Sequence, residues 1–453
     1  MKTVLNVLML LIPFIDFIWD IHIENYPDIR FVYFIYFAYF FTYIKNFITI
    51  SFFKQFITEF RLLALTIVGI VLLSLYNIYL DNTTSVLFSK QFIIVSFISF
   101  TSFMFIYNNR NDLNYIINLY LKISFVFACI AIFQEIFYLI GLEYLYNFSY
   151  LMLNPQQTYG TGFFIRASSF CAEPPMFAFA LIPATFISLY SFITGNFKFI
   201  SKIQSLIIII ATLLTYSAIG YCSLFLSAML LLLWNFENIK VKNFIGVLFL
   251  IAFIFSLGGN GIAMRIQDSI TLLNKSISNY EIHIPVKDKK KKGKIYDKKN
   301  KQNEINLSAY LLMVHFKRTI DDFYENPILG KGLGAYTYTK NSVKLKKYAL
   351  ANFPSWIPFR LDGSTSLIFK IVVEFGLAGI IMLFIILYRY YIFDFKYINK
   401  SNYFIIINNA MLVYIAFILI RMPFYFCNGL WIFVWIYIFS KQQFLKENNN
   451  ENF

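Results

Sequence analysis

The chain has 453 residues, of which 59% are hydrophobic and only 14% are charged, and its formal net charge is +15. This composition excludes a soluble globular domain, because apolar runs of about 17–25 residues, the length that crosses a bilayer, recur from end to end. The four cysteines are scattered and give no pattern of disulfides or zinc ligands. Because helices satisfy their own backbone hydrogen bonds in lipid, we expect an all-α polytopic membrane protein.

Twelve apolar segments predict about 12 transmembrane helices. The first segment lacks a small-residue cleavage site, so we interpret it as a retained helix and not as a signal peptide. The seventh and eighth segments are short enough to form either two helices or one hairpin bent around Ser217–Gly220. The segments are 3–21, 31–52, 62–80, 91–108, 115–141, 176–194, 203–216, 219–236, 243–258, 366–390, 403–420 and 424–440.

The basic residues predict the orientation of these helices. With the N-terminus inside, 14 Lys and Arg residues fall at cytoplasmic ends and loops, whereas the short outer loops hold only Arg30, Lys90, Arg166 and Arg421. Short cytoplasmic loops of membrane proteins carry an excess of positive charge. We therefore expect both termini to be cytoplasmic.

The predicted helices divide the chain into an N-terminal transmembrane bundle (1–258), a large extracytoplasmic loop (259–365), C-terminal transmembrane helices (366–440) and a cytoplasmic tail (441–453). The loop has about 107 residues and a net charge of +10, and loops of this length translocate regardless of charge. Its basic run at 287–304 fits either a solvated insertion or a patch for anionic sugar chains or lipid headgroups.

The end of the large loop has a different pattern. From Ile305, apolar residues recur at helical spacing until Asn326-Pro327, which is a typical helix stop. This predicts an amphipathic helix near the membrane surface. The Gly-rich "GKGLG" that follows (330–334) is not a phosphate-binding loop, because no strand precedes it and no Lys-Ser/Thr pair follows it.

The stretch "FIRASSFCAEPPMFAFAL" (164–181) places Arg166 and Glu173 before the sixth apolar segment. Glu173 can be a helix-start residue that suits the helix dipole, and Arg166 can be a loop cation. Alternatively, Arg166 binds phosphate, because its planar guanidinium matches phosphate oxygens. Other polar motifs fall on the same predicted outer side, including Asp362 and Arg421.

Five motifs in this order resemble those of the O-antigen polymerase and O-antigen ligase superfamily of bacterial surface polysaccharide synthesis. The resemblance spans about residues 115–440. The motifs are Arg166–Pro174, Ser217–Gly220, "NPILGKGLGAY" (326–336), "EFGLAG" (374–379) and "RMPFYF" (421–426).

Two departures from the family pattern favour a polymerase over a ligase. Thr365 and Ser366 stand where ligases typically carry His-Asn, and Ala218 stands in place of an arginine. The resemblance implies a metal-independent glycosyltransferase without a cofactor in the bacterial cytoplasmic membrane. It would transfer a glycan from polyprenyl diphosphate to another lipid-linked repeat unit of an O-antigen, capsule or exopolysaccharide.

The resemblance also implies candidate site residues and partners. Glu173 and Asp362 are candidate general bases, with Glu173 preferred, and Arg166, Arg318, Arg421 and His315 are candidates for binding the substrate. The implied partners are the lipid-linked oligosaccharide, the bilayer, a chain-length regulator and a flippase, with no nucleic acid.

The alternatives are an O-antigen ligase and a lipid-linked oligosaccharide flippase. A flippase is expected to carry charges along a central cavity, but few charges interrupt the predicted spans (Asp16, Lys122 and Glu135). No inverted repeat is evident either. A ligase differs from a polymerase in its acceptor, which the sequence does not define.

Overall fold

The computed structural model of the chain describes residues 2–16, 20–21, 29–148, 164–235, 243, 307–340, 364–393, 403–427 and 429–450. Within them the fold is helical, apart from two strands of two residues, β1 (Asp20–Ile21) and β2 (Ile29–Arg30), which pair antiparallel. The α-helices are α1 (Lys2–Ile15), α2 (Phe31–Tyr43), α3 (Ile50–Glu59), α4 (Arg61–Tyr79), α5 (Ser85–Asn108), α6 (Leu113–Ile140), α7 (Glu143–Tyr146), α8 (Pro174–Thr194), α9 (Lys202–Leu214), α10 (Ala218–Asn235), α12 (Leu307–Glu325), α15 (Leu367–Tyr390), α16 (Tyr403–Arg421) and α17 (Leu430–Asn450). Short 3-10 turns are η1 (Ile44–Asn46), η2 (Arg110–Asp112) and η6 (Ala335–Thr337).

The helices agree with an all-α membrane protein. Among the described residues, six helices are long and apolar enough to cross a membrane, and three more apolar helices are shorter. The count of about 12 spans therefore stays a prediction. The ninth predicted segment, 243–258, lies outside the described residues except for Asn243.

Several predicted boundaries were wrong. Helix α1 ends at Ile15 and not at residue 21, and α17 begins at Leu430 and continues to Asn450, past the predicted end at residue 440. The segment 31–52 was expected to be one helix, but α2 ends at Tyr43, η1 follows, and α3 begins only at Ile50. The polar pair Lys45-Asn46 lies in this break, where the apolar run is interrupted. The predicted amphipathic helix is confirmed as α12, which ends directly before Asn326-Pro327.

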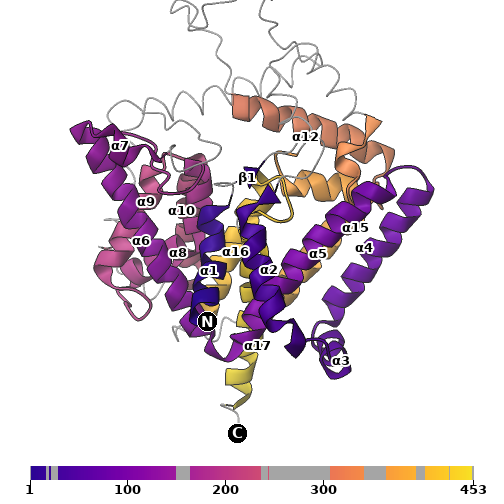
Figure 1. Cartoon of the computed structure of the whole chain (residues 1–453), viewed down its shortest axis with the longest axis horizontal. Coiled ribbons are helices and arrows are strands. Elements are labelled where there is room, and N and C mark those ends of the chain that lie inside the picture. Colours follow the sequence, from indigo (N-terminus) through magenta and orange to yellow (C-terminus); the bar gives the residue numbers. More distant parts are fainter. Residues whose placement is uncertain are drawn as a thin grey trace, which may run out of the picture.

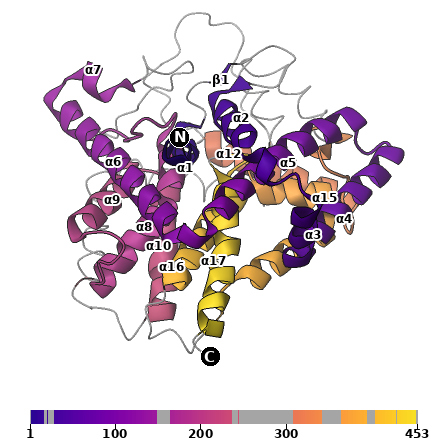
Figure 2. The same ribbon diagram turned by 60° about the horizontal axis from the view of Figure 1, so that its bottom comes forward.

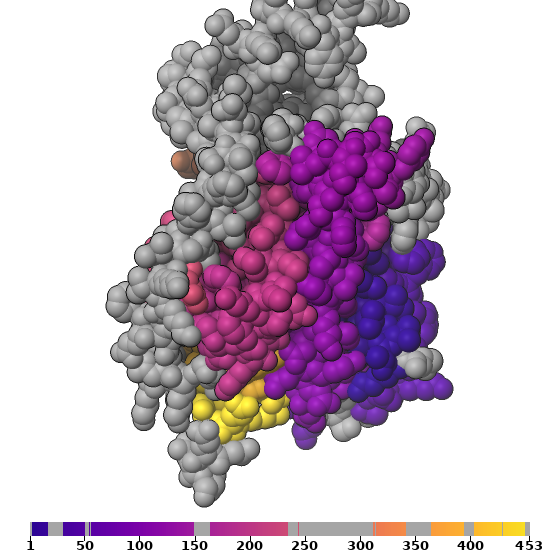
Figure 3. Space-filling model, turned by 90° about the vertical axis from the view of Figure 1, so that its left-hand side faces the viewer, coloured from indigo at the N-terminus to yellow at the C-terminus, as the bar shows by residue number. Residues whose placement is uncertain are grey.

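The helices form two groups joined by a central one. Helices α6, α8, α9 and α10 lie together on one side, α4, α5 and α15 on the other, and α1, α2, α16 and α17 between them (Figures 1 and 2). Among the six candidate spans of the described residues, α8 is the most buried, at 89%, whereas α4 is only 11% buried. On the outer face of the first group, α6 packs directly against the α9 region (Figure 3).

The two ends of the bundle have different contents. Figure 1 shows α12 lying across one end and both chain termini at the other. The strand β1, which follows α1, lies on the α12 side (Figure 1), and the ion pair between Asp16 and Arg30 (3.4 Å) joins the two ends of the α1–α2 connection. The Arg30 guanidinium lies over the rings of Phe424 and Phe426, so the segment after Arg421 belongs to this end as well.

Candidate active site

The loop Phe164–Glu173 is held firmly against α6. The backbone N–H of Ile165 donates to Glu135 Oε2 at 3.2 Å, and the N–H of Ser169 donates to Gln134 Oε1 at 2.7 Å. Two consecutive side chains of α6 thus fix this loop on either side of Arg166, whose own side chain is half-buried.

Glu173 begins α8, as the helix-start interpretation predicted. Its backbone is extended (φ −142°, ψ 151°), and Pro174 and Pro175 occupy the first helical positions. Its carbonyl accepts hydrogen bonds from the N–H groups of Met176 and Phe177, but its side chain makes no capping hydrogen bond. The half-buried carboxylate is therefore available for another role.

The structure places Glu173 in the neighbourhood of Arg421. Arg421 is the last residue of α16, and the charge of Glu173 acts on its guanidinium. The start of α15 reaches the same place, since Ser366 Oγ donates to the carbonyl of Leu419 at 2.9 Å. The predicted candidates Arg166, Glu173 and Arg421 thus belong to one end of the bundle, while Asp362 lies outside the described residues.

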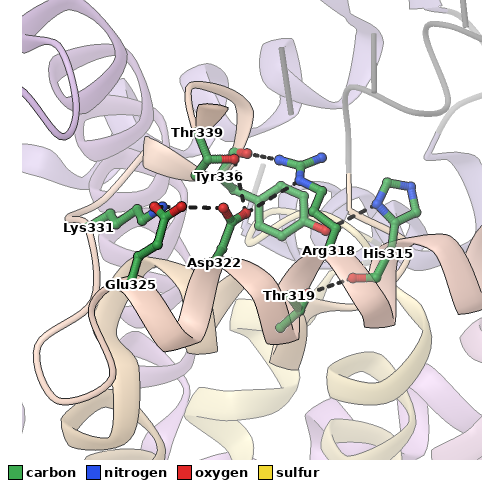
Figure 4. Close-up of polar contacts among 8 residues, drawn as sticks. All are labelled: His315, Arg318, Thr319, Asp322, Glu325, Lys331, Tyr336 and Thr339. Atoms are coloured by element: carbon green, nitrogen blue, oxygen red, sulfur yellow. Dashed lines mark hydrogen bonds and ion pairs between the residues drawn. The ribbon is translucent and has the colours of Figure 1, made fainter. Parts of the chain in front are cut away.

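Arg318 and His315 both contact Tyr336, in a set of polar residues that we call the α12 cluster (Figure 4). The Arg318 guanidinium donates to the carbonyl of Tyr336 and lies 4.1 Å from the centre of its ring. His315 Nδ1 is 3.1 Å from the Tyr336 hydroxyl. Burial raises the pKa of the Tyr336 phenol, so this hydroxyl is neutral at pH 7. The cluster comprises His315, Arg318, Thr319, Asp322, Glu325, Lys331, Tyr336 and Thr339.

Asp322 is the centre of the charges in the α12 cluster. Its carboxylate is fully buried, 3.6 Å from Arg318 Nε and 3.2 Å from Lys331 Nζ, and it accepts a 3.0 Å hydrogen bond from Thr339. Lys331 also pairs with Glu325 at 2.5 Å. Both cations of the cluster are therefore neutralised inside the protein.

The motifs "NPILGKGLGAY" and "EFGLAG" interlock at the base of the α12 cluster. The Lys331 N–H donates to the carbonyl of Val373 at 2.9 Å, and the Leu377 N–H donates to that of Pro327 at 2.8 Å. This pairing needs a break in α15 at Gly376 (φ 59°, ψ −150°). It also needs Gly330 (φ +67°), where an added Cβ would lie 2.5 Å from the α15 backbone.

Glu374, in the second of these motifs, has a structural position. It is fully buried, and its two oxygens accept hydrogen bonds from the Gly334 N–H (3.1 Å) and the Tyr425 hydroxyl (2.8 Å). The bond to Tyr425 ties α15 to the "RMPFYF" motif after Arg421.

Sequence reasoning missed several residues that shape this end of the bundle. Gln134, Glu135 and Asp322 organise the loop and the cluster, but the sequence shows Gln134 and Glu135 only as polar positions within an apolar span. Asp322 stands beside the exposed Asp321, and the helical period of α12 was the signal that separates the two. No group of three His, Cys, Asp or Glu side chains that could hold a metal ion is found where the structure describes the chain.

Long apolar helices with polar residues gathered at one end define a polytopic helical membrane protein. Residues 203–384 match the family model described as O-antigen ligase, which confirms the resemblance to the O-antigen ligase and polymerase superfamily. Searches among curated proteins and among solved structures found no match for the chain.

The matched segment contains the α12 cluster and the two interlocked motifs, as well as Ser217–Gly220. Arg166, Glu173 and Arg421 lie outside it. Their candidacy rests on their motifs and on the electrostatic effect of Glu173 on Arg421.

Proposed function

We propose that this protein is a polysaccharide polymerase of the O-antigen ligase and polymerase type, a family whose model matches residues 203–384. It transfers a glycan from a lipid diphosphate onto another lipid-linked repeat unit at the outer face of the bacterial cytoplasmic membrane. The observation that supports this most is that Glu173, at the end of the loop that carries Arg166, lies near enough to Arg421 for its charge to act on the guanidinium. A base and phosphate-binding cations are what such a transfer requires.

The chemistry follows from these residue types. A hydroxyl of the acceptor attacks the anomeric carbon of the donor, the new glycosidic bond forms, and the bond from that carbon to the lipid diphosphate breaks. Glu173 takes the hydroxyl proton as general base. Arg166 and Arg421 stabilise the charge that develops on the diphosphate leaving group, and their effect is stronger where water is excluded.

Arg318 and His315 have a positioning role in this proposal, because both contact Tyr336. Both are buried and hold the Tyr336 turn against α12. Glu374 links this turn to the segment after Arg421, because it accepts hydrogen bonds from Gly334 and Tyr425. Their predicted contact with substrate stays a prediction. Asp362 remains the alternative base, and its position is outside the described residues.

A polymerase is preferred to a ligase because Thr365 and Ser366 replace the His-Asn typical of ligases. Ser366 is fully buried, and its hydroxyl donates a hydrogen bond to the carbonyl of Leu419.

We extend the proposal to the topology and the partners of the protein. Both termini lie in the cytoplasm, the loop 259–365 faces outward, and the partners are a flippase and a chain-length regulator.

Deletion of the gene in the native strain, followed by a gel of its surface polysaccharide, tests the proposal. We expect glycans capped with a single repeat unit. Long chains that remain on the lipid carrier would instead indicate a ligase, and repeat units that accumulate inside the cell would indicate a flippase.

Labelling with an impermeant thiol reagent tests the orientation. We expect a cysteine at Ser342, in the predicted outer loop but outside the described residues, to react in intact cells or spheroplasts. Reaction only after lysis would place the loop in the cytoplasm and contradict an outer-face site.

A further inference from the structure

One carboxylate oxygen near the candidate site has no hydrogen-bond partner. Glu135, on α6, is 4% exposed, and its Oε2 accepts from the Ile165 N–H. Its Oε1 is buried and has no partner among the described residues. A buried carboxylate oxygen without a hydrogen-bond partner destabilises the folded state, because its desolvation is not compensated. Such an atom in a native structure therefore calls for an explanation.

A second unpartnered polar group lies beside the loop that Glu135 holds. The Tyr216 hydroxyl is buried and has no hydrogen-bond partner in the described part of the chain. Its ring packs on Phe164, directly before the Ile165 that donates to Glu135. The Ala167 N–H donates to the carbonyl of Leu214 at 3.0 Å. Tyr216 lies between α9 and α10 with a φ of +43°, a backbone conformation that is unfavourable for an aromatic residue. Strain of this kind concentrates at functional sites.

The surroundings suit a sugar. The Phe164 ring stacks on that of Tyr216 at a centroid distance of 6.2 Å, and Arg166 lies two residues further along the same loop. A carboxylate accepts a hydrogen bond from a hydroxyl group and a phenol donates one back, so the two groups together can satisfy both sides of one hydroxyl.

We propose that Glu135 and Tyr216 form a subsite that binds a sugar hydroxyl of the lipid-linked substrate. The inference rests on the proposed function, because it takes the substrate to be a glycan. Glu135 Oε1 accepts a hydrogen bond from the sugar hydroxyl, the Tyr216 hydroxyl donates one to the hydroxyl oxygen of the sugar, and Glu135 Oε2 keeps the loop with Arg166 in place. Both residues bind and position the sugar, and no bond changes at this subsite.

The two tyrosines Tyr216 and Tyr120 make a matched pair of variants. Tyr216→Phe removes a hydroxyl that has no partner in the described chain, so we expect the unfolding midpoint in detergent to stay unchanged. Tyr120→Phe removes a hydroxyl that donates to the carbonyl of Ala180 at 2.6 Å, so we expect a lower midpoint and unchanged substrate affinity. The reverse pattern would mean that the Tyr216 hydroxyl is engaged within the protein.

Binding to two probes tests the subsite itself, using the full-length purified protein. The probes are the polyprenyl-diphosphate oligosaccharide extracted from the deletion strain and polyprenyl phosphate without sugar. We expect Tyr216→Phe to weaken binding of the oligosaccharide about 3- to 10-fold and Glu135→Gln more than about 10-fold. Binding of polyprenyl phosphate is expected to be unaffected in both variants.

Each other outcome has a defined meaning. Unchanged oligosaccharide binding in both variants would overturn the subsite and leave the proposed function standing. Equal losses for both probes would also overturn it, because the residues would then serve the phosphate-binding loop and not the sugar. Failure of the wild-type protein to bind the oligosaccharide would overturn the proposed function, and the subsite with it.

Discussion

Two regions at one end of the bundle contain arginines and carboxylates. One is the loop Phe164–Glu173 together with Arg421, and the other is the α12 cluster. The two regions differ in how deeply these charged side chains are buried. In the α12 cluster, Arg318 and Asp322 are at most 4% exposed and contact each other. Arg166, Glu173 and Arg421 are half-buried. The first set stabilises the fold from inside, whereas the second keeps contact with the surroundings from which a substrate arrives.

The residue type alone therefore does not define whether an arginine in this chain has a structural or a substrate-binding role. An arginine whose charge is neutralised by a buried carboxylate has little capacity left for a diphosphate. An arginine at the edge of a loop retains that capacity. Variants in the two regions are therefore expected to change different measurable properties, stability in one and activity in the other.

The largest effect on stability is expected from Asp322→Ala. It leaves the buried cations Arg318 and Lys331 without their shared carboxylate, which we expect to lower the free energy of unfolding by about 3–5 kcal/mol. Denaturant unfolding in detergent measures this. The neighbouring Asp321, which is exposed, gives the control: Asp321→Ala is expected to behave like the wild type. Equal stability of the two variants would contradict a structural role for the cluster.

The next effect is expected from Gly330→Ala. A Cβ at this position would press against the α15 backbone at 2.5 Å with φ at +67°, so we expect a loss of about 2–3 kcal/mol. Gly69→Ala is the matched control, since nothing lies within 4 Å of its added Cβ. Thermal unfolding of both variants tests whether the two interlocked motifs depend on this glycine.

A much smaller effect on stability is expected from Glu173→Gln. Its half-buried carboxylate acts on Arg421 only through its charge, and even direct ion pairs at partly exposed sites contribute about 1 kcal/mol or less. The same unfolding assay measures it beside Asp322→Ala. A loss as large as that of Asp322→Ala would remove the distinction between the two regions.

Deletion of 287–301, a basic run outside the described residues, is expected to have the smallest effect on function. The free energy of closing a long loop changes little when the loop is shortened, so polymer synthesis is expected to stay within a few-fold of the wild-type rate. Quantifying polymer by gel measures this. Loss of all polymer at normal expression would show that the run binds substrate.

Much of the helical fold could be predicted from the sequence, because hydrophobic length and period are local properties. The α12 helix and its stop at Asn326-Pro327 followed from spacing alone, and the proline start of α8 followed from Glu173-Pro174-Pro175. The break after Tyr43 was missed, because the polar pair that interrupts the apolar run is short.

The site could be predicted only in part, because its contacts join distant segments. The sequence motif identified Arg166 and Glu173. No local sequence pattern indicates the hydrogen bond that Glu135 accepts beside Arg166, or the electrostatic effect of Glu173 on Arg421. The same holds for the burial of Arg318, which depends on Asp322 and on a turn that follows the helix.

The most direct test of the central claim is a polysaccharide gel from the deletion strain that carries Arg166→Lys or Glu173→Gln. Arg389→Lys, an exposed arginine in the last turn of α15, serves as the control and is expected to restore full-length polymer. Lysine keeps the charge of Arg166 but lacks the planar guanidinium that binds phosphate through two hydrogen bonds. Glutamine keeps the shape of Glu173 but cannot act as a base. We therefore expect both variants to express normally and to leave glycans with a single repeat unit. Full-length polymer from both would contradict an active site at Arg166 and Glu173.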